Sequence, residues 1–140
     1  MLTVMGEGEL VELFLRTGRR IRRRQMVLLA PLGISPGQAR ALRVIGRGEG
    51  ALRMSEVAAR LDIAARSATG VVDSLEGMGL VSRTVDSGNR RVVLVGVTAE
   101  GEKVLGAMVS ARLEAGEEVF SGLSFEDRDR LLEVLRKLDS

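Results

Sequence analysis

The 140-residue sequence contains no cysteine, no histidine, no tryptophan and no tyrosine. Without cysteine there are no disulfide bonds, no thiol nucleophile and no thiol redox switch. Without histidine there is no Ser-His-Asp triad and no imidazole metal ligand. The three phenylalanines are the only aromatic residues, which leaves little capacity for stacking on single-stranded bases. We therefore expect no enzyme, no metal and no other cofactor, and we assign no catalytic residue.

Long apolar runs are also missing. The run Met26–Ala30 is stopped by Pro31 and falls far short of the ~20 residues that span a bilayer. The arginines before it lie too far inside the chain for an export signal. We expect a cytoplasmic protein that does not associate with a membrane.

The formal net charge of +2 conceals an uneven distribution. Residues 1–97 hold 15 arginines and nine acidic residues, a net charge of +6, whereas residues 98–140 hold six basic and ten acidic residues, a net charge of −4. A basic N-terminal part and an acidic C-terminal part favour an anionic partner for the former.

The spacing of apolar residues predicts four helices in the first part of the chain. Pro31 and Gly33 should end the first, and Ser35 followed by Pro36 is the N-cap and first-turn signal of the second. Ser55 should cap the third. The predicted ranges are 9–29, 36–47, 55–61 and 65–78.

The period then becomes that of extended chain. The β-branched runs Leu80–Val85 and Arg91–Val97 flank the polar segment Asp86–Arg90, which predicts a β-hairpin. Asp86 and Arg91 stand on either side of its tip, and we expect them to form an ion pair. Thr98 and Ser124 should then cap two C-terminal helices.

Three short helices followed by a two-stranded ribbon are typical of the winged helix-turn-helix, a mainly α fold with a small β-hairpin wing. In this fold the helix at 65–78 would enter the major groove of double-stranded DNA by its N-terminus. Arg90 or Arg91 would lie beside the adjacent minor groove. The predicted DNA-contacting residues are Ser55, Arg66, Ser67, Thr69, Gly70, Arg83, Arg90 and Arg91.

The chain resembles the MarR family of bacterial winged-helix regulators. The resemblance is carried by Glu56–Leu61, by Leu75–Arg83, and by Asp86–Arg91 followed by the segment Thr98–Gly101. It implies one MarR-like domain over residues 1–140, with a DNA-binding part at 35–97 and dimerisation helices at 1–34 and 98–140. It also implies a transcriptional regulator, expected to be a repressor, that binds a pseudo-palindromic site as a homodimer.

The periodic apolar faces of the terminal helices independently favour a homodimer. The expected interface residues are Leu10, Phe14, Phe120, Leu131, Leu135 and Leu138. The resemblance further implies a small anionic or aromatic effector, for which the candidate residues are Arg16, Arg19 and Arg20.

Two departures from the family pattern keep an alternative open. Ala64 stands where a capping Ser or Asp is usual, and Gly70 stands where arginine is frequent. A winged-helix protein-interaction module without specific DNA readout would tolerate both.

Overall fold

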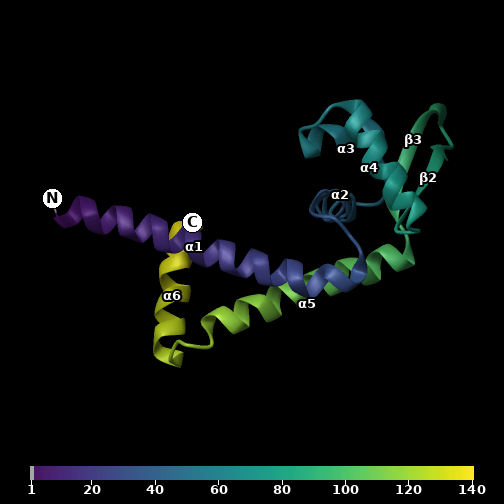
Figure 1. The fold of residues 1–140 in the computed structure, drawn as a ribbon. Coiled ribbons are helices and arrows are strands. Elements are labelled where there is room, and N and C mark those ends of the chain that lie inside the picture. Colours follow the sequence, from purple (N-terminus) through teal and green to yellow (C-terminus); the bar gives the residue numbers. More distant parts are fainter. Residues whose placement is uncertain (1) are drawn as a thin grey trace. The chain divides into compact units, whose positions relative to one another are not determined.

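The structure, a computed structural model, describes residues 2–140, and their side chains from residue 6 onward. The helices are α1 (Leu2–Leu29), α2 (Pro36–Gly46), α3 (Met54–Leu61), α4 (Ala65–Gly77), α5 (Ala99–Phe120) and α6 (Phe125–Leu138), with a 3₁₀ turn at Ala30–Leu32 (Figure 1). The strands are β1 (Leu52–Arg53), β2 (Val81–Asp86) and β3 (Asn89–Val97). The predicted mainly helical fold with a β wing is confirmed.

The chain divides into two compact units. The winged unit spans Leu29–Val109, and the helical unit combines the chain up to Leu28 with Ser110–Ser140. Within residues 2–140, no helix is both long and apolar enough to cross a membrane.

Local capping signals set the start of α2 in the winged unit. The Ser35 hydroxyl accepts a hydrogen bond from the backbone N–H of Gln38 at 3.1 Å, and the Gln38 side-chain oxygen accepts one from the backbone N–H of Ser35 at 2.9 Å. This reciprocal pair is a capping box, and Pro36 occupies the first helical position. The predicted N-cap is confirmed.

The core of the winged unit lies between helices α2, α3 and α4 and the sheet. Every third or fourth residue of each helix is buried, as expected for helices with one apolar face. The buried side chains include Ala41, Leu42, Ile45, Val57, Ala58, Leu61, Ala68, Val72, Leu75, Val81 and Val95.

The start of α3 differs from the prediction. Ser55 is not the N-cap, because the helix already begins at Met54, directly after β1. The cap position is Arg53, whose backbone N–H donates to Glu56 Oε1 at 3.0 Å. Strand β1 itself was not predicted, since two residues carry no periodicity. It pairs with β3 and completes a sheet in the order β1-β3-β2.

The wing is an antiparallel hairpin of β2 and β3 with a register shift near its tip. Val85 pairs with Val93, but the next residue, Asp86, pairs with Asn89, so that residues 90–92 bulge from the ladder. The predicted ion pair between Asp86 and Arg91 is therefore wrong: no ion pair joins these two described residues. The Asp86 carboxylate instead accepts from the backbone N–H of Gly88 at 3.0 Å.

The end of the wing is joined tightly to the start of α5. The Thr98 hydroxyl donates to the Gly79 carbonyl at 2.6 Å and accepts from the Gly101 backbone N–H at 3.0 Å. The predicted Thr98 cap is thus confirmed. Gly79 adopts a left-handed φ of 76°, which ends α4 and turns the chain into β2.

In the helical unit, α1 packs beside the C-terminal half of α5, and α6 follows a short turn. Arg24 and Glu118 form an ion pair at 2.6 Å between these helices, and Arg128 and Glu117 form another at 3.0 Å. The Ser124 hydroxyl accepts from the Asp127 backbone N–H at 3.1 Å, which confirms the predicted cap of α6.

Candidate nucleic-acid interface and apolar groove

A short turn connects α3 to α4. Asp62 adopts a left-handed φ of 54°, and the Ile63 backbone N–H donates to the Ala58 carbonyl at 3.1 Å. This hydrogen bond closes the end of α3 and redirects the chain into α4. The N-cap of α4 is Ala64, whose methyl side chain satisfies none of the helix's first N–H groups. These donors remain open to an external acceptor such as a phosphate oxygen.

Helix α4 separates its residues onto two faces. Ala68, Val72 and Leu75 are buried in the core. The exposed strip consists of Arg66, Ser67, Thr69 and Gly70, which were all predicted DNA contacts. The structure thus brings these four residues together on one open surface.

Gly70 gives the exposed strip a flat section. A side-chain carbon added at this glycine would meet no atom within 4 Å, so packing inside the protein does not require a glycine. Next to it, the Thr69 hydroxyl donates to the Ala65 carbonyl at 3.0 Å and is held close to the helix backbone. The missing side chain therefore leaves room for a partner to approach the α4 backbone.

The remaining predicted contacts lie on separate elements. Arg90 and Arg91 are exposed in the bulge of the wing, and Ser55 is exposed in the first turn of α3. The hairpin lies next to α4, with its tip extending away from the helix (Figure 1).

Arg83 occupies a different environment from the other predicted contacts. Its guanidinium donates to Asp73 Oδ1 at 2.6 Å, to Glu76 Oε1 at 2.9 Å and to the Thr69 carbonyl at 3.4 Å. Burial opposes the charge of Arg83, but the hydrogen bonds that it donates to Asp73 and Glu76 outweigh the effect of burial and hold the pKa of the guanidinium above its ordinary value. A direct DNA contact, as predicted, would compete with these two carboxylates.

Sequence reasoning did not single out Asp73 and Glu76. A signal was present, because acidic residues three apart on a helix share one face, and a basic residue followed on the next strand. The sequence did not indicate that β2 packs back against α4, which brings Arg83 next to the two acidic residues. Sequence reasoning also missed the side-chain link between α2 and α4, in which Gln38 Nε2 donates to Ser74 Oγ at 3.3 Å.

The positive charge is shared between the two parts of the chain. Residues 35–97 contain nine arginines and six acidic residues, a net charge of +3, and residues 1–34 contribute the other +3 through the arginines at 16–24. Because Arg83 is neutralised by carboxylates, the exposed charges of the candidate interface are those of Arg66, Arg90 and Arg91.

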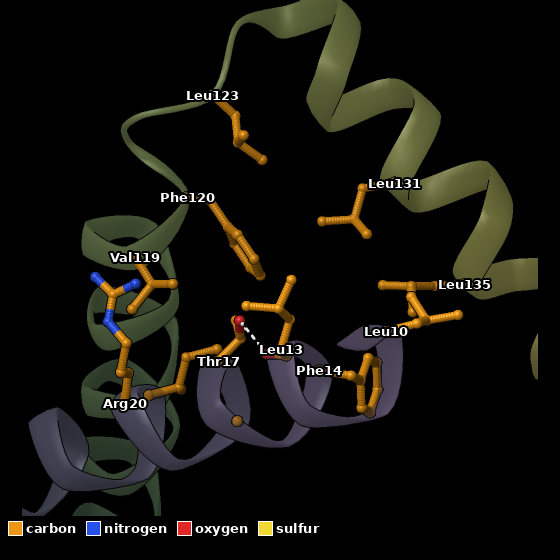
Figure 2. A pocket seen from close by; sticks show the side chains of 12 residues that line it. Leu10, Leu13, Phe14, Thr17, Arg20, Val119, Phe120, Leu123, Leu131 and Leu135 are labelled. Atoms are coloured by element: carbon orange, nitrogen blue, oxygen red, sulfur yellow. Dashed lines mark hydrogen bonds between the residues drawn. The ribbon is translucent and has the colours of Figure 1, made fainter. Parts of the chain in front are cut away.

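An apolar groove of about 490 Å³ opens between α1, the end of α5 and α6 in the helical unit (Figure 2). Five of the six predicted dimer residues line it together: Leu10, Phe14, Phe120, Leu131 and Leu135. The sixth, Leu138, lies outside the groove lining and is 74% exposed. Leu10 and Phe14 are also largely exposed, at 67% and 59%.

The effector candidates are placed differently from one another. Arg20 lies at the edge of the apolar groove and also borders a polar hollow formed with Arg23, Arg24 and Glu118. Arg16 and Arg19 are exposed on α1 and line neither of these two hollows.

Comparison with known proteins finds transcriptional regulators among the relatives of this chain. A sequence model of the MarR family matches residues 32–92, which include the helix-turn-helix and most of the wing. The transcriptional regulator HosA of Escherichia coli O127:H6 is 38% identical over 64 residues, 46% of this chain and 47% of HosA. The chain thus aligns with about half the length of this curated relative.

Two further likenesses extend beyond the winged part. The HTH-type transcriptional repressor MdtR of Bacillus subtilis is 27% identical over 106 residues, 76% of this chain and 68% of MdtR. The structure of an S. aureus MepR mutant bound to an oligodeoxyribonucleotide has the same fold, with a TM-score of 0.75 and 24% identity over 91% of this chain and 94% of MepR.

The matched region, the winged helix-turn-helix and the flanking helices agree in extent and order with this family. Residues 32–92 thus match the winged helix-turn-helix of the MarR family, and the chain as a whole shares the MarR-like fold.

Proposed function

We propose that the chain is a DNA-binding transcriptional repressor that acts as a homodimer, with α4 as its recognition helix. The observation that carries this proposal is the open strip of Arg66, Ser67, Thr69 and Gly70 on the one face of α4 that the core does not use. In this function the protein would bind DNA in the cytoplasm and would catalyse no reaction.

The strip supports a major-groove contact on chemical grounds. Arg66 offers paired donors suited to guanine or phosphate, the two hydroxyls donate or accept, and Gly70 permits close approach. Arg90 and Arg91 on the wing are suited to the adjacent minor groove. Two relatives lend support, since MepR has been seen with an oligodeoxyribonucleotide and MdtR is described as a repressor.

The apolar groove of the helical unit supports the homodimer. Leucines and phenylalanines exposed to this extent form a patch that soluble proteins ordinarily cover. We propose that residues 1–34 and 98–140 of a second copy cover it, while residues 35–97 bind DNA. A two-fold dimer would then bind a pseudo-palindrome with half-sites about 10 bp apart.

DNA binding by the full chain is the direct test. We expect submicromolar affinity for a duplex taken from the region upstream of its own gene, measured by fluorescence anisotropy. The affinity should fall steeply as salt rises, because lysine and arginine contacts release condensed counterions from phosphates. Affinity that is weak and equal at low and high salt would contradict the proposal.

The alternative is a protein-interaction module that does not bind DNA specifically. It is favoured by the uncapped start of α4 at Ala64 and by the absence of a side chain at Gly70 in the exposed strip. The variants R66E and R90E separate the two functions, with R112E on α5 as a matched exposed control. Loss of DNA binding in the first two variants alone supports the repressor, whereas binding that survives both changes removes α4 and the wing as the DNA-binding surface.

A small anionic or aromatic effector is a further part of the proposed function. Arg20 is the best placed of the three candidate arginines, since it borders both the apolar groove and the hollow beside Arg24. An effector that binds one conformation of the dimer more tightly would shift the DNA-binding equilibrium. Its test is the dissociation of the DNA complex by anionic aromatic compounds, compared between wild type and R20Q.

A further inference from the structure

Helix α4 carries two negative charges close to its proposed DNA-binding strip. Residues three or four apart share a helix face, so Asp73 follows Gly70 by one turn and Glu76 follows Asp73 by another. Their side chains are 60% and 43% exposed. Uncompensated carboxylates at these positions would repel the phosphates on either side of the groove that α4 enters.

Arg83 compensates both charges from the neighbouring strand. The terminal nitrogen Nη2 of Arg83 lies 2.6 Å from Asp73 Oδ1, and the other terminal nitrogen, Nη1, lies 2.9 Å from Glu76 Oε1. The second oxygen of Glu76 also accepts from the backbone N–H of Arg83 at 3.2 Å. The Arg83 side chain is only 22% exposed, and its guanidinium also donates to the Thr69 carbonyl at 3.4 Å.

These contacts have two consequences for the proposed function. The planar guanidinium satisfies two carboxylates at once, which fixes the start of the wing against the C-terminal half of α4. The positive charge of Arg83 is also paired within the protein, because a phosphate contact would require Arg83 to leave both carboxylates.

We infer that Arg83 is a positioning residue, which masks the charges of Asp73 and Glu76 and aligns the wing with α4 without touching DNA itself. This inference rests on the proposed DNA binding. It replaces the direct contact that the sequence alone suggested for this arginine.

DNA affinity that is lost with Arg83 should return when its partners Asp73 and Glu76 are neutralised. R83M leaves two unpaired carboxylates beside the DNA and should bind at least about tenfold more weakly than wild type. The triple variant R83M/D73N/E76Q has neither the guanidinium nor the two negative charges. Its affinity should return to within about threefold of wild type, because the repulsion that Arg83 masked is gone. The remaining difference measures what the alignment of the wing by Arg83 contributes.

The salt dependence of binding supplies a second readout. If Arg83 contacted a phosphate, the triple variant would lose one such contact, and the slope of log affinity against log salt would become shallower by about 0.9. We expect the wild-type slope instead. R112M, which removes an exposed arginine outside the winged unit, is the matched control and should leave affinity unchanged.

The triple variant decides between the outcomes. Charge masking is supported if this variant recovers more than half of the lost affinity, on a logarithmic scale, and keeps the wild-type salt slope. Smaller recovery, a shallower slope, or an R83M variant that binds like wild type overturns it. Thermal unfolding of each variant identifies any variant that fails to fold.

If R83M does not fold, the affinity and the salt slope of the triple variant are compared with those of wild type instead. Failure of wild type to bind DNA would instead contradict the proposed function.

Discussion

Glycine has opposite roles at two positions of the winged unit. At Gly101 a side-chain carbon would overlap the Leu80 carbonyl oxygen and would lie 2.6 Å from a methyl carbon of Val97. Because one of these neighbours is backbone, the clash cannot be relieved by turning a side chain. The glycine of the Thr98–Gly101 segment therefore allows α5 to start against the base of the wing.

We expect G101A to lower the free energy of unfolding by about 3 kcal/mol, the upper part of the range for overpacked sites. Urea denaturation monitored by circular dichroism measures this. The control is G106A in the same helix, where an added carbon meets nothing within 4 Å and where alanine should be neutral or stabilising. Equal stability of the two variants would show that the close approach at Leu80 is not required.

At Gly70 the space around the added carbon is empty, so G70A should raise the free energy of unfolding by about 0.5–1 kcal/mol through helix propensity. The same substitution should weaken DNA binding, because the methyl group occupies the space proposed for backbone approach. Denaturation and fluorescence anisotropy on one preparation measure both effects. G77A, at the end of the same helix, should leave DNA affinity intact, and a G70A variant that bound DNA as well as wild type would refute the role given to Gly70.

At the scale of single elements, the capping box at Ser35 and Gln38 links the start of α2 to the recognition helix. Gln38 satisfies the Ser35 backbone N–H with its side-chain oxygen and reaches Ser74 on α4 with its side-chain nitrogen. Ser74 in turn donates to the Val71 carbonyl at 2.7 Å. One short side chain thus fixes the start of one helix and its contact with another.

We expect S35A to lower the free energy of unfolding by about 1 kcal/mol, because the Gln38 backbone N–H loses its acceptor. The midpoint of urea unfolding reports the change. S110A removes an exposed hydroxyl from the middle of α5 and should cost nothing, since alanine favours the helix interior. A loss of equal size in both variants would mean that the hydroxyl does not act as a cap.

At the scale of the whole molecule, the exposed apolar groove of the helical unit is the basis for the proposed homodimer. Leu131 and Leu135 on α6 face Leu10 and Leu13 on α1 across it (Figure 2). A second copy that buried these side chains would gain roughly 25 cal/mol for each Å² of apolar surface removed from water.

L135E should therefore convert the dimer into a monomer at micromolar concentration, as measured by sedimentation equilibrium, because a carboxylate would be buried in the interface. Affinity for a pseudo-palindromic duplex should fall with it, while K137E, at an exposed position of the same helix, should remain dimeric. If L135E sediments as a folded dimer, the groove is not the dimer interface.

Much of the fold could be predicted because the decisive interactions are short-range. The hydroxyl caps at Ser35, Thr98 and Ser124 act over three residues, and the buried positions of α2, α3 and α4 follow from helical periodicity. For the same reason the exposed strip from Arg66 to Gly70 could be located before the structure was known.

Only the tertiary structure decided interactions between segments whose separation carries no local signal. It added β1 through pairing with β3, moved the cap of α3 from Ser55 to Arg53, and separated Asp86 from Arg91 by a register shift. It also brought Arg83 into ion pairs with Asp73 and Glu76. Sequence specifies which residues are charged or apolar and how they alternate, whereas the partner of a charge depends on which strand returns to which helix.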